Sequence, residues 1–149
     1  MQDDGRTDSG EWVRPILAYL TAGSAFAVLD YLWLSNAAPR LYRPAIGEIM
    51  ADDVRWGPAA AFYVLYLVGV TWLVVLPALK AGGTVRALWT GGLFGLVAYA
   101  TYDLTNQATL RIWPIHLTLI DMAWGAFATA TAAVVSVYLT RRLAHRTTQ

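Results

Sequence analysis

The sequence predicts an all-α integral membrane protein, an up-down four-helix bundle whose four transmembrane helices place both termini in the cytoplasm. Of its 149 residues, 57% are hydrophobic and only 14% are charged, and the mean hydropathy is +0.44. A typical soluble domain has roughly 25% charged residues and about 45–50% apolar ones. The apolar residues here are gathered into four long runs, which is typical of membrane spans rather than of a soluble core.

Each run is close to the ~20 residues that a helix needs to cross a ~30 Å hydrocarbon layer. Barrel strands would alternate apolar and polar residues over ~10 positions, and these runs do not alternate, which excludes a β-barrel. The second run carries no charged residue. The predicted spans cover residues 15–36, 58–79, 87–106 and 113–139.

The segments outside the spans are short. Residues 1–14 are predicted to form a flexible tail, because their acidic residues do not suit the positive start of a signal peptide. Residues 15–140 make up the predicted transmembrane domain, and residues 141–149 a basic C-terminal tail. The first two connections contain prolines and glycines, which are typical of turns and loops. Part of the first loop, 41–50, fits either a short interfacial helix or an ordinary structured loop.

Basic residues set the predicted orientation. Seven of the eleven Lys and Arg residues fall on the side of the termini, which the positive-inside rule assigns to the cytoplasm. We therefore expect a multi-pass membrane protein with both termini in the cytoplasm. The seven are Arg6, Arg14, Lys80, Arg86, Arg141, Arg142 and Arg146, and the four on the other side are Arg40, Arg43, Arg55 and Arg111.

Composition excludes several classes of function. Without cysteine the chain has no disulfide, thiolate nucleophile, iron–sulfur cluster or cysteine-based zinc site, and two histidines are too few for a histidine-built metal centre. A net charge of +1 without a basic–aromatic run gives no indication of nucleic-acid binding. No nucleotide loop, nucleophile elbow or zinc-binding helix motif is present, so we expect neither a cofactor nor a resident metal.

Three carboxyl groups fall within the predicted spans: Asp30, Asp103 and Asp121. Each costs up to about 2.5–3.5 kcal/mol at the centre of a helix in the bilayer. At 1.5 Å per residue, Asp30 lies ~22 Å and Asp103 ~24 Å from the cytoplasmic edge, and Asp121 ~12 Å below the outer edge. All three are therefore predicted to face the bundle interior in the outer third of the membrane. We expect them either to form a site for a proton, a cation or a substrate, or to have a purely structural role.

Aromatic residues recur beside these acids at i,i+3 spacing, which places both members of a pair on one helical face. Tyrosine hydroxyls and indole N–H groups are donors that a buried carboxylate uses. Core packing and interface anchoring are the alternative roles of these rings, and His116 and Arg111 are assigned to the outer rim. The predicted polar core comprises Asp30, Trp33, Tyr63, Tyr66, Tyr99, Tyr102, Asp103, Asn106, Asp121 and Trp124.

Small residues share the faces that carry the acids. Gly91 and Gly95 precede Asp103 on the third span, and Gly-x-x-x-Gly spacing permits close helix approach. On the fourth span a row of small residues follows Asp121, namely Gly125, Ala128, Thr129, Ala132 and Ser136. Because small faces pack against other helices, the acids are predicted to point inward.

The most distinctive segment is 97–106 (VAYATYDLTN), followed by Trp113-Pro114 and by 121–125 (DMAWG). With 29–33 (LDYLW) and 62–66 (FYVLY), these motifs make the chain similar to the bacterial membrane proteins grouped as domain of unknown function family 2177. The resemblance covers residues 16–138. It implies a four-span inner-membrane protein and carries no activity with it.

Three functions remain open from the sequence, which does not decide whether the chain is an enzyme. The leading one is binding or transport of a small solute, a cation or a proton, because clustered acids that cannot all ionise share protons; a permeation path would need a homodimer. The second is an enzyme acting on lipids or fatty-acyl chains, with paired carboxyls as acid and base or holding Mg²⁺. The third is a structural or assembly subunit of a larger membrane complex.

Overall fold

The computed structural model describes residues 9–146, which form helices and short connections. No strand is present in this part of the chain. The helical elements are α1 Ser9–Ala37, η1 Ala38–Tyr42, α2 Arg43–Ile46, η2 Gly47–Ile49, α3 Trp56–Gly69, η3 Val70–Val75, α4 Leu76–Lys80, α5 Gly83–Thr109 and α6 Ile115–Arg146.

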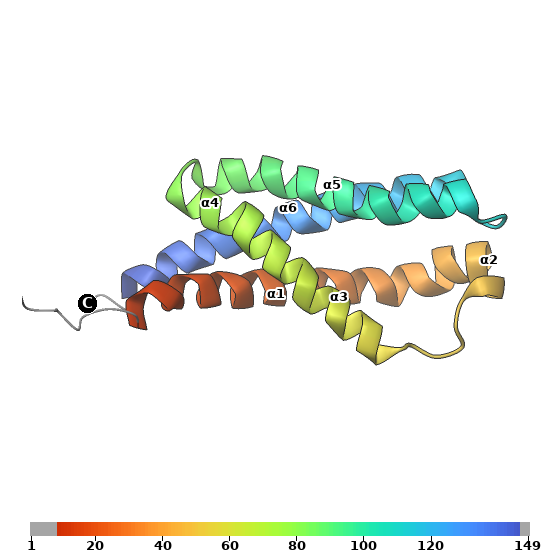
Figure 1. The fold of residues 1–149 in the computed structure, drawn as a ribbon, viewed down its shortest axis with the longest axis horizontal. Coiled ribbons are helices and arrows are strands. Elements are labelled where there is room, and N and C mark those ends of the chain that lie inside the picture. The colour runs from red at the N-terminus through yellow and green to blue at the C-terminus, as the bar shows by residue number, and fades with distance from the viewer. Residues whose placement is uncertain (1–8, 147–149) are drawn as a thin grey trace, which may run out of the picture.

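The chain passes four times along the long axis of the molecule (Figure 1). α1 runs away from the end where the described chain begins, α3 to α4 returns, α5 runs out again and α6 returns beside α1. The first and last described residues therefore lie at one end of the bundle. α1 and α6 extend beyond the predicted spans at this end, beginning at Ser9 and ending at Arg146. Residues 1–8 of the predicted tail lie outside the described residues.

The first connection differs from both sequence-based readings. α1 does not end in a loop but continues through η1 and α2 to η2, so that helical structure persists to Ile49. Pro39 lies in the first turn of the π-helix η1, and Pro44 lies in α2 directly after it. Proline lacks an N–H and clashes with the carbonyl four residues earlier, and a π-helix bonds to the residue five back instead. A π-helix also precedes a proline in the second pass, where η3 lies directly before the α4 segment that contains Pro77.

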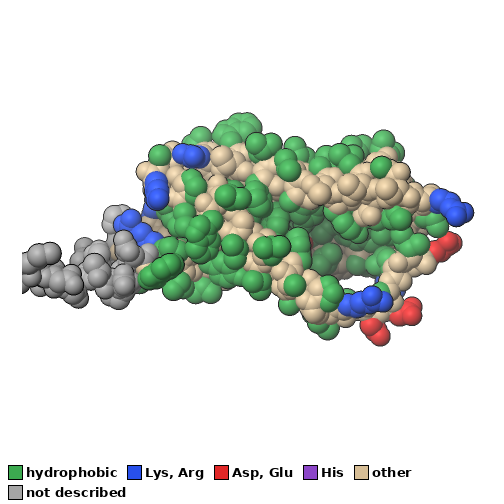
Figure 2. Space-filling model, in the orientation of Figure 1, with side chains coloured by type: hydrophobic (Ala, Val, Ile, Leu, Met, Phe, Trp, Pro, Cys, Tyr) green, Lys and Arg blue, Asp and Glu red, His purple; other side chains and the backbone are tan. Residues whose placement is uncertain are grey.

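The second pass crosses the bundle obliquely (Figure 1). α3 packs mainly against α1, whereas η3 packs against α1, α5 and α6. The space-filling view shows the surface hollowed between α3, α5 and the linker 50–55 (Figure 2). The second pass therefore packs against the other helices mainly through η3, and α3 diverges from α5.

The tightest contact joins α5 and α6, which pack along most of their length. A Cβ added at Gly91 would lie 3.1 Å from the Ala130 Cα. One added at Gly95 would overlap the Gly125 carbonyl and the Thr129 hydroxyl, and one at Gly125 would overlap the Tyr99 ring. Glycine at these positions permits the two backbones to approach closely, as the spacing on both spans predicts.

The surface is that of a membrane protein. Large hydrophobic side chains are exposed along the passes, for example Leu65 at 74% and Trp89 at 74%, far beyond the scattered apolar residues of a soluble surface. Figure 2 shows hydrophobic side chains through the middle of the molecule and charged ones at its two ends. Within the described residues, three helical segments are long and apolar enough to cross a membrane: Trp12–Ile49, Trp56–Lys80 and Ile115–Ala144. α5 is 27 residues long but is not among these three.

Replacing Gly95 by alanine should destabilise the bundle, because the new methyl group meets backbone atoms that cannot move independently. Overpacking of this kind costs about 1–3 kcal/mol, which outweighs the gain of about 1 kcal/mol from alanine's helix propensity. Gly92→Ala is the matched control, since its Cβ would have only ordinary contacts at 3.8 and 3.9 Å. Unfolding in mixed micelles with increasing dodecyl sulfate, followed by circular dichroism, measures both. Equal midpoints for the two variants would contradict this packing.

Candidate functional site

The three intramembrane aspartates are buried together toward the end of the bundle opposite the termini. Their exposed fractions are 7% for Asp30 on α1, 0% for Asp103 on α5 and 4% for Asp121 on α6. Asp121 lies within electrostatic range of both other carboxyl groups. We call these three residues the acid layer. Three separate helices thus contribute carboxyl groups to one buried cluster.

Asp30 is held by the second pass. The Tyr63 hydroxyl of α3 donates a hydrogen bond to the Asp30 carboxyl group, and the Tyr63 ring meets the Phe26 ring edge-on at 6.2 Å. The indole N–H of Trp124 lies beside Asp30 without completing a hydrogen bond. This carboxyl group therefore ties α1 to α3.

Asp121 is held by the π-helix η1. The Tyr42 hydroxyl donates a hydrogen bond to the Asp121 carboxyl group and accepts one from the Trp33 indole N–H at 3.0 Å. Trp33 in turn stacks on Trp124, with ring centroids 4.5 Å apart and an interplanar angle of 8°. Ile46, Trp113 and Leu117 form a small buried cluster beside Tyr42, at the end of the bundle opposite the termini.

Asp103 has no such partner. Both of its carboxyl oxygens are buried, and neither forms a hydrogen bond. An unmade hydrogen bond at a buried polar group costs about 1–3 kcal/mol, and more for a charged one. Asp103 is therefore the one member of the acid layer whose carboxyl group is not committed to holding helices together.

Two further tyrosines lie between the acid layer and the middle of the bundle. Tyr99 is half-buried, and its ring occupies the space above Gly125. The Tyr66 hydroxyl lies 2.6 Å from that of Thr129, which donates to the Gly125 carbonyl at 2.7 Å. These residues pack the acid layer on its inner side.

The remaining residues predicted for the core lie at its rim. Tyr102 is 57% exposed and packs edge-on against Trp113 at 5.4 Å. Asn106, one turn further along α5, is half-buried beside Tyr102. His116 and Arg111 are exposed outside the layer. Although their i,i+3 spacing places both rings on neighbouring positions of α5, the Tyr99 ring packs over Gly125 and the Tyr102 ring is largely exposed.

Sequence reasoning missed Tyr42, because the first connection was expected to be a loop or a surface helix. It also missed the hydroxyl of Thr129, which was counted only as a small residue. A tyrosine between two prolines is a weak signal by itself. Only the uninterrupted helix through η1 shows that Tyr42 reaches Asp121.

No cation balances the acid layer within residues 9–146: Asp30 and Asp121 bond to tyrosines, and Asp103 bonds to nothing. Among the described residues no group of three or more His, Asp or Glu side chains is placed to hold a metal ion. The layer therefore has carboxyl groups and neutral donors but no positive charge.

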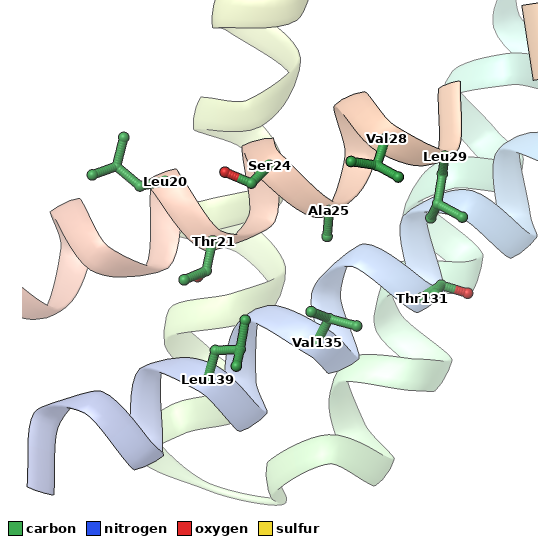
Figure 3. Close-up of a pocket in the computed structure, with 9 residues that line it drawn as sticks. All are labelled: Leu20, Thr21, Ser24, Ala25, Val28, Leu29, Thr131, Val135 and Leu139. Carbon is green, nitrogen blue, oxygen red and sulfur yellow. The ribbon is translucent and has the colours of Figure 1, made fainter. Parts of the chain in front are cut away.

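An apolar groove of about 530 Å³ lies between α1 and α6, nearer the end with the termini (Figure 3). No acid or aromatic residue of the layer takes part in it. Its walls are Leu20, Thr21, Ser24, Ala25, Val28, Leu29, Thr131, Val135 and Leu139.

Comparison with known proteins gives one match. A family model described as "Predicted membrane protein (DUF2177)" matches residues 15–138, a stretch that contains the whole acid layer. No curated protein and no solved structure matches the chain.

Replacing Tyr42 by phenylalanine should destabilise the end of the bundle opposite the termini. The variant leaves the Asp121 carboxyl group and the Trp33 indole without their shared partner, at a cost of about 1–3 kcal/mol. Tyr31→Phe is the control, because its ring is 73% exposed. Dodecyl sulfate unfolding followed by tryptophan fluorescence measures the difference. If Tyr42→Phe and Tyr31→Phe unfolded at the same dodecyl sulfate concentration, the hydrogen bond from Tyr42 to Asp121 would not be stabilising the bundle.

Proposed function

The chain belongs to the DUF2177 family of predicted membrane proteins, and from that premise we propose that it is a proton-binding protein of the bacterial inner membrane whose site is the acid layer. Four transmembrane helices, α5 included, put both termini in the cytoplasm and the acid layer near the outer face. α5 is long enough for this role, since 27 residues span ~40 Å at 1.5 Å per residue.

The observation that carries the proposal is the unpartnered, fully buried carboxyl group of Asp103. An isolated carboxylate is too costly to keep ionised in a dry interior, so such a group takes up a proton instead. Polar residues inside the membrane are rare because of this cost, and they mark proton relays and ion paths. Asp103 is therefore the residue at which a proton is expected to bind and leave.

Asp103 does not titrate alone. Like charges in a low-dielectric interior cannot all ionise, so interacting carboxyl groups share protons as one unit. No described Lys, Arg or His faces the layer. The titratable groups that face these carboxyls from α1, η1, α3, α5 and α6 are Asp30, Tyr42, Tyr63, Tyr66, Tyr99, Tyr102, Asp103 and Asp121.

The burial of the layer favours a proton over a larger ligand. The hollow beside α3 in Figure 2 leaves each of the three aspartates at most 7% exposed. The groove between α1 and α6 is lined by other residues. A proton reaches a buried carboxyl group by passing along hydroxyl groups, and Tyr42 bonded to Asp121 supplies one at the outer end.

Infrared difference spectroscopy of the protein in lipid bilayers tests this function. A protonated carboxyl group has a C=O stretch that disappears when the group ionises. The wild type should show such bands over a pH titration, and Asp103→Asn should lack one of them while retaining its helical circular dichroism. Asp52→Asn is the control, because Asp52 is exposed in the linker between η2 and α3 and its replacement should leave the bands of the buried carboxyl groups unchanged.

The proposal is wrong if Asp103→Asn and the wild type give the same carboxyl bands at every pH.

A further inference from the structure

The groove between α1 and α6 is open to the surface of the bundle and takes no part in the acid layer (Figure 3). Its α1 wall runs over residues 20–29 and its α6 wall over residues 131–139, and no charged side chain lines it. Leu20 and Val28 in the α1 wall are 57% and 61% exposed. Its volume of about 530 Å³ lies within the ~300–1,000 Å³ of small-molecule sites. The groove therefore suits a hydrocarbon chain rather than a polar solute.

Two arginines continue the sides of the helices that line the groove, toward the end of the bundle with the termini. Arg14 precedes Thr21 by seven residues and Ala25 by eleven. Arg142 follows Val135 by seven residues. Helical residues seven or eleven apart return to nearly the same side of the helix, because both intervals are close to whole turns. Both arginine side chains are exposed, so each is free to reach a ligand in the groove.

The two arginines also lie at nearly the same level of the bundle. The Thr21 hydroxyl on α1 lies 2.9 Å from the Ser136 hydroxyl on α6. From this contact Arg14 lies ~10 Å and Arg142 ~9 Å toward the termini, at 1.5 Å per residue. The groove reaches Leu29, which lies ~22 Å from Arg14 by the same rise. This is half of the ~40–45 Å thickness of a bilayer with its head-group regions, so the arginines and the groove together cover one leaflet.

The charge at this end of the groove is positive. Among residues whose side chains the structure describes, the nearest acid to Arg14 on α1 is Asp30, ~24 Å along the helix. The nearest to Arg142 on α6 is Asp121, ~32 Å away. The described charged side chains that Figure 2 shows at this end are basic. The Arg142 guanidinium lies over the Tyr138 ring, 4.5 Å from its centroid, and in such a contact a guanidinium keeps N–H donors for a phosphate.

We propose that the groove between α1 and α6 binds one acyl chain of an anionic phospholipid, whose phosphate pairs with Arg14 and Arg142. Charge complementarity favours this occupant over a second copy of the chain. Two copies with their termini on one side of the membrane would bring the same arginines together at a shared face, and like charges oppose that contact. The site depends on the helices lying in a bilayer and is independent of proton binding by the acid layer.

The test is photo-crosslinking of the full chain in phosphatidylcholine liposomes that contain a trace of a phosphatidylglycerol probe with a diazirine in one acyl chain. Digestion and mass spectrometry locate the attached lipid. Crosslinks should concentrate on residues 20–29 and 131–139, and a phosphatidylcholine probe with the same acyl chains should give several-fold fewer of them. Unlabelled phosphatidylglycerol should displace the probe, whereas inorganic phosphate should not, because the groove holds the acyl chain.

Arg142→Gln should lower the yield of groove crosslinks about fivefold, equivalent to the ~1 kcal/mol that a basic residue near the membrane surface contributes to binding anionic lipid. Arg111→Gln is the matched control, because Arg111 is exposed at the opposite end of the bundle. Ala25→Phe fills the groove without changing the charge and should remove the groove crosslinks. Val97→Phe, on an exposed face of α5, should leave them unchanged.

Crosslinks spread evenly over the exposed faces would overturn the site, and so would equal yields from the two lipid probes. A yield in Arg142→Gln equal to that of the wild type would show that the arginine does not bind the phosphate, which contradicts the proposal. A groove that takes no lipid, in a chain that chemical crosslinking shows to be dimeric, would assign the groove to a second copy instead.

Discussion

The close approach of α5 to α6 is the constraint on which the rest of the structure depends. Glycine at positions 91, 95 and 125 removes the side chains that would hold these helices apart. Asp103 and Asp121 are carried on the two helices thus joined, and their carboxyl groups become buried neighbours. Without that contact each acid would face lipid or a wider interior. The small residues that let α5 and α6 approach are therefore also the residues that bury the Asp103 and Asp121 carboxyl groups next to each other.

The structure separates three aspartates that the sequence presents as equivalent. Asp30 and Asp121 accept hydrogen bonds from Tyr63 and Tyr42, and these bonds tie the first pass to α3 and η1 to α6. Asp30 and Asp121 thus have the structural role that the sequence offered as the alternative to a binding site. Asp103 is buried as deeply without a partner. Under the proposed function, proton binding and stability are divided among side chains of one type, a difference that a sequence pattern cannot reveal.

Much of the fold could be predicted from hydrophobic run lengths, because a lipid environment permits few structures other than long helices. Glycine spacing likewise predicted which sides of α5 and α6 pack. The sequence left the first connection open between a loop and a short interfacial helix, and in the structure helical elements follow α1 without a break through Pro39 and Pro44 to Ile49. Tyr42 was missed for that reason. The four-span count and the orientation stay predictions, and α5 is not among the three described segments that are long and apolar enough to cross a membrane.

The central claim is that Asp103 and Asp121 form one electrostatic unit. Infrared titration of Asp121→Asn tests it most directly, by following the carboxyl band assigned to Asp103. With its like-charged neighbour neutralised, Asp103 should lose its proton more readily, and its band should disappear at a lower pH than in the wild type. A band that disappears at the same pH in both proteins would show that the two carboxyl groups titrate independently and would contradict a shared acid layer.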